Sequence, residues 1–186
     1  ALLDGIEEGA LRTKEIVLGL KNFSRVGESD LKEANVHEGI NSTLMLLKNR
    51  LKSGITVKKQ YGDIPVIECL PGKLNQVFMN IIKNAIDAVE GKGTIEIKTW
   101  ADNDNVYISV CDTGPGMDEE TRKKVFEPFF TTKPMGEGTG LGLSISYGII
   151  RQHRGTLEVF SEPGKGAEFL ICLPVRGDES ALEQKK

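Results

Sequence analysis

The sequence predicts an α+β domain, a two-layer sandwich in which about three helices cover one face of a mixed sheet of five to six strands. The first observation behind this is that strand-like and helix-like segments follow one another in mixed order. The second is a composition of 39% hydrophobic and 27% charged residues, which is ordinary for a globular protein. The third is length, because 186 residues suit one compact domain with an appendage.

The first segment, residues 1–25, has apolar positions separated by alternating steps of three and four, as in a helix that packs on another helix. We expect the second helix of a truncated dimerisation stem, or alternatively a terminal helix packed on its own domain. A polar linker is expected at 26–35. The apolar positions of the segment are Leu3, Ile6, Ala10, Thr13, Val17 and Leu20.

The main domain is expected to span 36–175, followed by a polar tail at 176–186. Residues 113–140 are rich in Gly and Pro and have little regular pattern, which predicts a functional lid. Asn35 and Glu38 resemble a capping box at the start of the first helix. Helices are predicted at 36–51, 71–90 and 141–153, with one short helical pattern at 118–126 inside the lid. Strands are predicted at 56–61, 66–70, 94–100, 106–112, 156–161 and 167–174.

Charge and cysteine content exclude several classes of function. The net charge of −3 gives no electrostatic case for binding nucleic acid or an anionic membrane. Cys69, Cys111 and Cys172 are far apart and fit neither a metal site nor an even disulfide set, so we expect reduced core cysteines. We find no membrane-spanning apolar run and no signal peptide, so the segment is expected to be cytoplasmic.

The helix predicted at 71–90 has an unusual polar face. Gln76, Asn80, Asn84 and Asp87 project together because residues three or four apart are neighbours on a helix. A solvated face would favour Lys, Glu and Arg, since Asn is a poorer helix former. Amide and carboxylate oxygens are ligands of the kind that hold Mg²⁺ beside phosphate. The pattern therefore indicates a nucleotide site, whereas a single Asn would be interpreted as an ordinary surface residue.

Two further segments carry glycines at positions where a ligand or a turn would need them. Asp112 ends a predicted strand, and its carboxylate is a candidate acceptor for an exocyclic amine such as that of adenine. Gly114 and Gly116 would let the backbone approach the ring. The alternative is that Asp112 only caps a turn. The third glycine segment, 164–169, is by itself interpreted as a hairpin turn.

A glycine-rich stretch at 136–143 leads directly into a predicted helix. Four alternate glycines before a helix N-terminus predict a phosphate cradle, because unpaired N–H groups and the helix dipole both favour an anion. The stretch is not a Walker A loop, since the Gly-Lys-Ser/Thr ending is missing. A Rossmann interpretation also fails, because no strand precedes it.

Four motifs stand in one order: NIIKNAIDA with its two asparagines, DTGPG at 112–116, FEPFFTTK at 126–133 and GEGTGLGL at 136–143. Together they resemble the asparagine, first glycine, phenylalanine and second glycine boxes of two-component sensor histidine kinases. The resemblance covers about Val36 to Pro174 and implies the Bergerat ATP-binding fold, which is shared with gyrase B, Hsp90 and MutL.

The resemblance implies a role for each matching position, with ATP or ADP and Mg²⁺ as the ligands. Asn84 would bind the metal, and Asn80 would share it or lie beside the phosphates. Asp112 would bind the adenine amine, Lys133 would contact phosphate, and Phe126 and Phe129 would anchor the lid. The expected binding residues are Asn80, Asn84, Asp87, Asp112, Gly114, Gly116, Lys133, Gly138, Thr139, Gly140, Leu141 and Gly142, with Asn84 and Asn80 on the metal.

The sequence departs from the family at two points. Ala167 stands where the third glycine segment usually carries Thr near the adenine, which implies a modest weakening of binding. The two histidines, His37 and His153, lack the context of a phosphoacceptor, so the phosphorylated His is expected upstream of residue 1, and no catalytic residue can be named within the chain.

The resemblance implies transfer of the ATP γ-phosphoryl group to a His on the stem and then to an Asp of a response regulator. Expected partners are the stem itself, a response regulator and a second copy of the full-length protein, with no nucleic acid and no direct membrane contact. The protein would be cytoplasmic or the cytoplasmic part of a membrane-anchored sensor. The alternatives are a serine kinase of the anti-sigma-factor type and an ATP-gated clamp or scaffold domain.

Overall fold

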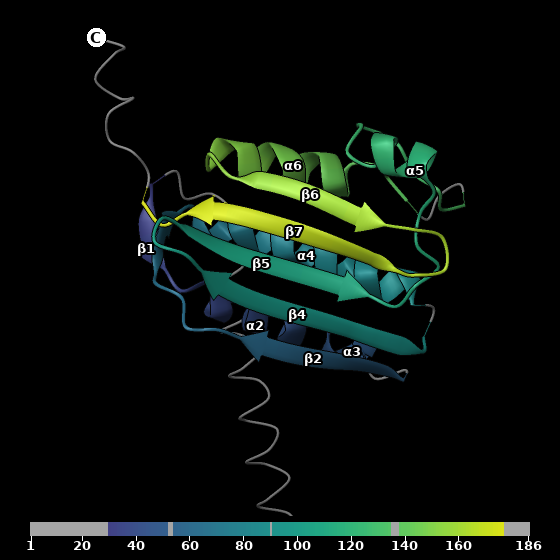
Figure 1. Ribbon diagram of the computed structural model, residues 1–186, viewed down its shortest axis with the longest axis horizontal. Helices are drawn as coiled ribbons and strands as arrows, with labels where there is room; N and C mark the ends of the chain where they lie inside the picture. The colour runs from purple at the N-terminus through teal and green to yellow at the C-terminus, as the bar shows by residue number, and fades with distance from the viewer. Residues whose placement is uncertain (1–29, 52–53, 90, 135–137, 177–186) are drawn as a thin grey trace, which may run out of the picture.

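The computed structural model describes residues 30–51, 54–89, 91–134 and 138–176, so the expected stem at 1–25 and nearly all of the tail lie outside the described residues. A five-stranded sheet forms one layer, and helices cover one of its faces (Figure 1). The prediction of an α+β sandwich with a mixed sheet is confirmed. In spatial order the strands are β2 (Ile55–Tyr61), β4 (Gly93–Ala101), β5 (Asn105–Asp112), β7 (Ala167–Pro174) and β6 (Thr156–Ser161).

The sheet is mixed because one of its four neighbouring strand pairs is parallel and the other three are antiparallel. β2 pairs in parallel with β4, whereas the β4–β5, β5–β7 and β6–β7 pairs are antiparallel. Parallel neighbours need a crossover, and the chain between β2 and β4 contains the long helix α4 (Pro71–Ala88). β4 and β5, two of the predicted strands, are joined by a tight hairpin at residues 102–104.

A second, two-stranded sheet was not expected. β1 (Lys32–Ala34) pairs antiparallel with β3 (Ile67–Cys69). The strand predicted at 66–70 therefore exists but lies outside the main sheet, and the segment predicted as a linker contains a strand. Three residues are too few to show an alternating pattern, so this pairing depends on partners that are distant in sequence.

The remaining helices are α2 (Val36–Leu46), α3 (Lys48–Leu51), α5 (Glu119–Lys124) and α6 (Gly142–Gln152). Asn35 is the N-cap of α2, and its side chain accepts a 2.9 Å hydrogen bond from the His37 N–H. The single helix predicted over 36–51 is interrupted at Leu47, which ends α2. The other boundaries agree with the expected ones to within about two residues.

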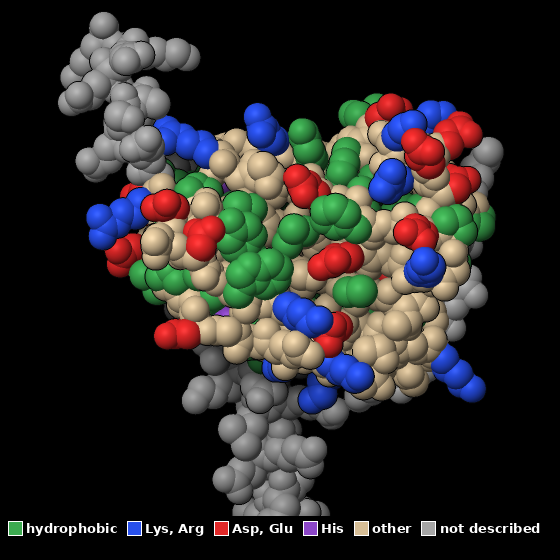
Figure 2. Space-filling view, viewed as in Figure 1, with side chains coloured by type: hydrophobic (Ala, Val, Ile, Leu, Met, Phe, Trp, Pro, Cys, Tyr) green, Lys and Arg blue, Asp and Glu red, His purple; other side chains and the backbone are tan. Residues whose placement is uncertain are grey.

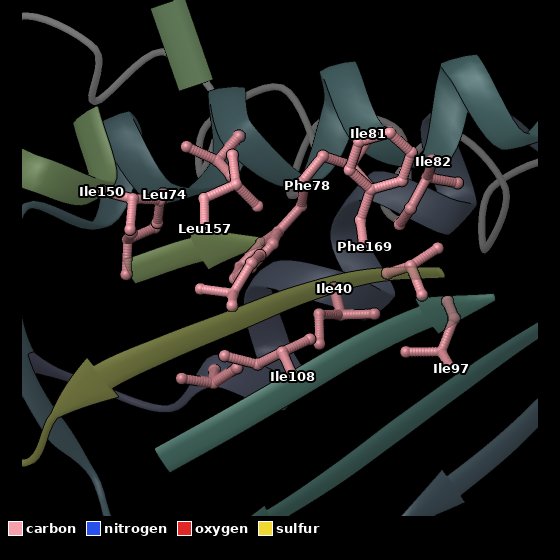
Figure 3. Packing of buried hydrophobic residues seen from close by; sticks show 14 of the residues in the cluster. Ile40, Leu74, Phe78, Ile81, Ile82, Ile97, Ile108, Ile150, Leu157 and Phe169 are labelled. Atoms are coloured by element: carbon pink, nitrogen blue, oxygen red, sulfur yellow. The ribbon is translucent and has the colours of Figure 1, made fainter. Parts of the chain in front are cut away.

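The core lies between α4 and the sheet. α4 sits between α2 and α6 and contacts both. Figure 3 shows Phe78, Ile81 and Ile82 reaching from α4 toward Ile108 and Phe169 on the strands. Each fully buried Ile contributes roughly 1.5–3 kcal/mol relative to an exposed one. The apolar stripe of α4 thus fixes which way its polar face points.

Among the elements that the structure describes, all helices lie on one face of the sheet and none covers the opposite face (Figure 1). Figure 2 shows charged side chains of both signs mixed with apolar ones on this side. Trp100 and Tyr107 stack here with ring centroids 5.3 Å apart. All three cysteines are free thiols, as expected, but only Cys69 lies in the core, while Cys111 and Cys172 are half-buried. Among the described residues, no helix has the length and apolar character needed to cross a membrane.

Candidate functional site

The polar face of α4 meets the start of α6. Asn80 donates from Nδ2 to the Gly142 carbonyl at 2.9 Å and to Ser146 Oγ at 3.1 Å. With its amino group engaged in this way, Asn80 keeps Oδ1 as an acceptor or ligand atom. Asn84 lies half-buried on the same face, one turn further along.

The two helices are antiparallel and do not end together. His153 at the end of α6 bonds Leu70 at the start of α4, and Asn80 bonds Gly142 at the start of α6. α4 therefore runs eight residues past the start of α6, about 12 Å at the helical rise. This overhang, residues 81–88, lies at the right-hand end of the molecule in Figure 1 and carries two of the predicted site residues.

Asp87, in the overhang, is held by two cations. Lys133 donates to its Oδ2 at 2.5 Å, and Arg50 of α3 donates to its Oδ1. Burial by itself would raise the pKa of Asp87, but the hydrogen bonds and charges of Lys133 and Arg50 outweigh it and hold the pKa below its ordinary value. The carboxylate is therefore ionised near neutral pH, and it joins α3, α4 and the predicted lid.

The glycines before α6 lie against the lid. A Cβ on Gly138 would be 2.5 Å from Thr131 Oγ1, and a Cβ on Gly140 would be 2.3 Å from the carbonyl carbon of Phe129. Phe129 N–H also donates to the Gly140 carbonyl at 2.9 Å. Gly140 has φ of +64°, which an L side chain rarely adopts. These contacts explain why glycine occupies the two positions.

α6 begins without a polar cap. Its N-cap is Leu141, an apolar residue that offers no side-chain acceptor, and the Thr139 hydroxyl lies 3.4 Å from the Leu141 nitrogen. First-turn N–H groups of a helix have no carbonyl partner within the helix. The predicted phosphate loop therefore presents N–H groups and the positive end of the α6 dipole beside Asn80.

Asp112 lies at the end of β5 with only 4% of its surface exposed. Its Oδ1 accepts a 2.8 Å hydrogen bond from Gly114 N–H, and the backbone of Ala167 also donates to the carboxylate. Burial raises the pKa of this carboxyl above its ordinary value, while the two backbone hydrogen bonds oppose the rise. Asp112 both caps the following turn and remains a buried acceptor, so the two interpretations are compatible.

The third glycine segment, 164–169, by itself interpreted as a hairpin turn, lies with the residues just before it directly against the Asp112 loop. A Cβ on Gly116 would be 2.1 Å from the Glu162 carbonyl oxygen, and one on Gly166 would be 1.9 Å from the Asp112 carbonyl oxygen. Ser161 joins the two loops, since its Oγ accepts from Met117 N–H at 2.8 Å and donates to the Gly166 carbonyl at 2.7 Å.

Sequence reasoning did not identify the contributions that Ala167, Ser161 and Arg50 make to the candidate site. Ala167 contributes to the site through its backbone N–H, which needs no hydroxyl. Ser161 gave no signal of its own, because a lone Ser at a strand end is common. Arg50 also gave none, because its partner is 37 residues away.

The expected aromatic anchors of the lid differ from each other. Phe126 packs on Tyr147 of α6 and edge-on to Phe169 of β7, with centroids 5.3 and 6.5 Å apart. Phe129 is 74% exposed and has φ of +67°, so the expectation that it anchors the lid is wrong. Its backbone, rather than its ring, makes the contact with Gly140.

Both histidines have structural roles. His37 stacks on Tyr61 at a centroid distance of 4.2 Å, and its Nε2 lies 2.8 Å from Thr99 Oγ1. His153 is buried, with Nδ1 2.8 Å from the Ile149 carbonyl and Nε2 accepting from Leu70 N–H at 2.9 Å. Such an arrangement requires the neutral ring, protonated on Nδ1. Burial lowers the pKa of both rings.

The predicted residues thus form two groups, joined by the end of α4. Asn80, Asp87, Lys133 and the loop into α6 make one group. Asp112, Gly114 and Gly116 make the other, which touches α4 where a Cβ on Gly114 would meet the Ala88 carbonyl at 2.8 Å. Within the described ranges, no set of three or more His, Cys, Asp or Glu side chains is placed to hold a metal ion. A metal here would rely on amide oxygens and ligand atoms.

The fold and the two groups define an ATP-binding α+β domain. Residues 69–177 match the family described as histidine kinase-, DNA gyrase B-, and HSP90-like ATPase, and the chain belongs to this family. The similarity of the described domain to solved structures narrows its class. The structure of this chain superposes on the catalytic domain of histidine kinase ThkA with a TM-score of 0.72 and 31% sequence identity. The match covers 80% of this chain and 99% of the ThkA domain.

The curated relatives are named as kinases. Sporulation kinase E of Bacillus subtilis (strain 168) is 52% identical over 115 residues, which is 61% of this chain and 15% of that protein. The signal transduction histidine-protein kinase AtoS of Escherichia coli (strain K12) is 35% identical over 167 residues, 87% of this chain and 27% of that protein. The chain therefore spans a small part of these relatives, and their names favour neither the serine kinase nor the scaffold alternative.

Proposed function

We propose that the chain is the ATP-binding catalytic domain of a sensor histidine kinase and that it binds ATP or ADP with Mg²⁺ over the α4 overhang. The observation that carries this proposal is the position of α4. The C-terminal half of α4 contacts the uncapped start of α6 through Asn80 and the loop of the buried carboxylate through Ala88. The contact at Asn80 would lie at the phosphate end of a bound nucleotide, and the contact at Ala88 would lie at its adenine end.

At the adenine end, Asp112 would accept a hydrogen bond from the exocyclic amine. Its carboxylate is buried and held by the Gly114 and Ala167 backbone, so it is already oriented. An acceptor at this point favours adenine over guanine, because guanine presents a carbonyl oxygen at the corresponding ring position. Glycine at 114 and 116 keeps the backbone free of side chains on this side.

At the phosphate end, the N–H groups of Gly138 to Gly142 and the α6 dipole would bind phosphate oxygens. The amide oxygens of Asn84 and Asn80 fit Mg²⁺, which commonly takes one or two protein oxygens and fills its remaining positions with phosphate and water. When bound, the ion would neutralise phosphate charge. Positioning and charge stabilisation account for most catalysis in phosphoryl transfer.

The phosphoryl acceptor would be a histidine outside these 186 residues. His37 is stacked on Tyr61, and His153 has both ring nitrogens engaged. We propose that the acceptor lies on a dimerisation stem, that the full-length protein is a cytoplasmic or membrane-anchored homodimer, and that the phosphoryl group passes to an Asp of a response regulator. Phosphohistidine is acid-labile and phosphoserine is acid-stable, which separates this proposal from the serine kinase alternative in a longer chain.

Titration calorimetry of the chain with ADP and a non-hydrolysable ATP analogue, with and without Mg²⁺, tests the proposal. Asp112→Asn should weaken both nucleotides about tenfold or more, because hydrogen bonds to a charged group are worth about 1.5–3 kcal/mol. Asp63→Asn, at an exposed carboxylate between β2 and β3, is the matched control and should bind normally. GDP should bind more weakly than ADP.

Asn84→Ala should remove most of the gain in affinity that Mg²⁺ gives. If wild-type protein bound neither nucleotide, or if Asp112→Asn bound as tightly as wild type, the proposal would be wrong. If Asn84→Ala kept the full Mg²⁺ dependence, the scaffold alternative would regain support.

A further inference from the structure

Asp87 presents an electrostatic problem at the phosphate end. It lies on the α4 face shared with Asn80 and Asn84, and its side chain is only 19% exposed. A half-buried carboxylate beside a triphosphate would repel it. The structure resolves this with two cations, since Lys133 binds one carboxylate oxygen and Arg50 binds the other. The three side chains together carry one net positive charge.

The two cations are placed differently with respect to the phosphate loop. The aliphatic part of the Lys133 side chain lies against Gly138. A Cβ added to Gly138 would be 3.2 Å from the Lys133 Cβ and 3.4 Å from the Lys133 Cδ. Lys133 therefore stands between Asp87 and the loop that leads into α6. Arg50 approaches Asp87 from α3, with 44% of its side chain exposed. A lysine is a flexible point charge that can change partners, whereas the planar guanidinium is suited to a lasting carboxylate pair.

We infer that Arg50 and Asp87 are positioning residues that set the preference for nucleotides with a terminal phosphate, by deciding how readily Lys133 leaves Asp87 for that phosphate. The inference rests on the proposed function. In the nucleotide-free protein Asp87 holds Lys133 beside the phosphate loop. When a γ-phosphate is present, Lys133 exchanges the carboxylate for the phosphate, and Arg50 stays to neutralise Asp87.

This exchange of partners predicts that substitutions of Asp87 and of Arg50 change the preference for the γ-phosphate in opposite directions. Without the carboxylate, Lys133 has no competing partner and is free to contact the γ-phosphate. Without Arg50, the Asp87 carboxylate is neutralised by Lys133 alone and attracts it more strongly. Lys133 therefore leaves Asp87 for the γ-phosphate less readily. A structural role alone would give the same sign, because loss of either partner would loosen the same ion pair.

The experiment is titration calorimetry of the whole chain with Mg²⁺-ADP and with the Mg²⁺ complex of a non-hydrolysable ATP analogue. The measured quantity is the ratio of the two dissociation constants. Asp87→Asn should favour the analogue by about two- to fivefold, and Arg50→Gln should disfavour it by a similar factor, the range expected for a partly exposed ion pair. Lys133→Gln should lower affinity for the analogue and leave ADP unchanged.

Three controls isolate the exchange. In the Lys133→Gln background, Asp87→Asn should have no further effect, whereas a through-space effect of the lost charge would persist. Arg50→Lys keeps the charge but loses the planar guanidinium, so its ratio should lie between those of wild type and Arg50→Gln. Lys124→Gln breaks the exposed pair with Glu120 on α5 and should change nothing. Thermal unfolding checks that each variant is folded.

The inference is overturned if Asp87→Asn and Arg50→Gln shift the ratio in the same direction, or if the Asp87→Asn effect survives in the Lys133→Gln background. It is also overturned if ADP and the analogue change equally in every variant. Each of these results leaves nucleotide binding and its dependence on Asp112 intact. Failure of the wild-type chain to bind either nucleotide instead removes the proposed function, and this inference with it.

Discussion

At the scale of single residues, the site depends on close backbone contacts that only glycine permits. Gly166 has φ of +76°, and an added Cβ would lie 1.9 Å from the Asp112 carbonyl oxygen. Gly164, two residues earlier, has nearly the same φ of +77° but no atom within 4 Å of an added Cβ. A side chain at Gly164 would therefore add backbone strain alone, whereas a side chain at Gly166 would add the same strain and a steric clash with Asp112.

We predict that Gly166→Ala destabilises the protein more than Gly164→Ala does. Gly164→Ala should cost about 1–2 kcal/mol for a left-handed backbone, and Gly166→Ala about 3 kcal/mol or more because a carbonyl must also move. Only Gly166→Ala should weaken ADP binding, since the displaced carbonyl belongs to Asp112. Chemical unfolding and calorimetry measure the two effects. Equal losses of stability and affinity in both variants would show that the contact with Asp112 is unimportant.

At the scale of elements, His153 joins the end of α6 to the start of α4. Nε2 accepts from Leu70 N–H, and Leu70 is the N-cap of α4, which has no side-chain cap. The other ring nitrogen bonds the Ile149 carbonyl within α6. Protonation would leave the buried Leu70 N–H facing a second donor, so only the neutral ring can make this hydrogen bond between the two helices.

We predict that the free energy of unfolding decreases as the pH falls below about 6.5. Burial lowers the pKa of His153 in the folded state, so the unfolded state, with a pKa of 6.5, takes up the proton first. The contribution is complete above pH 6.5 and is lost progressively below it, by at most about 1.4 kcal/mol per unit of pH for one residue.

Urea unfolding at pH 7.5 and 5.5 measures this dependence. His153→Gln should flatten it substantially. His37→Gln is the matched control and should flatten it less, because the His37 ring is less buried although burial lowers its pKa in the same direction. An unchanged slope in His153→Gln would assign the pH dependence to other groups.

At the scale of the whole molecule, the candidate nucleotide site of the described domain lies apart from both histidines. The overhang of α4 and the start of α6 meet at one end of the sandwich, and His153 lies at the opposite end of α6 (Figure 1). His37 is on α2 with its ring against Tyr61. Neither ring lies among the residues of the candidate site.

We therefore predict that the 186-residue chain binds Mg²⁺-ATP yet does not phosphorylate itself. Incubation with ATP labelled at the γ-phosphate should leave no acid-labile label on the chain, whereas addition of a separately expressed stem carrying the acceptor histidine should produce label on the stem. Acid-labile label on the chain alone would contradict the prediction, and His37→Gln and His153→Gln would then identify the acceptor.

The fold was predictable to a large extent because its main elements have local causes. The apolar stripe of α4 and the alternation in β5, β6 and β7 are periodic over many residues, so burial on one face determines their type. β1, the break at Leu47 and the separate β1–β3 sheet have no such periodicity and depend on distant partners.

The same distinction applies to the site. The sequence alone indicated the family, through the resemblance of its four motifs. It also indicated the amide face of α4 and the glycines at 114, 116, 138 and 140, because these follow from residue type and spacing along the chain. Only the tertiary structure decided that Gly166 and Ser161 support the Asp112 loop, that Phe129 is exposed, and that Arg50 shares Asp87 with Lys133. The contacts among these involve residues tens of positions apart, such as Asp112 with Gly166 and Asp87 with Arg50, and packing creates them without leaving a local pattern. The exposure of Phe129 likewise depends on how the chain around it packs.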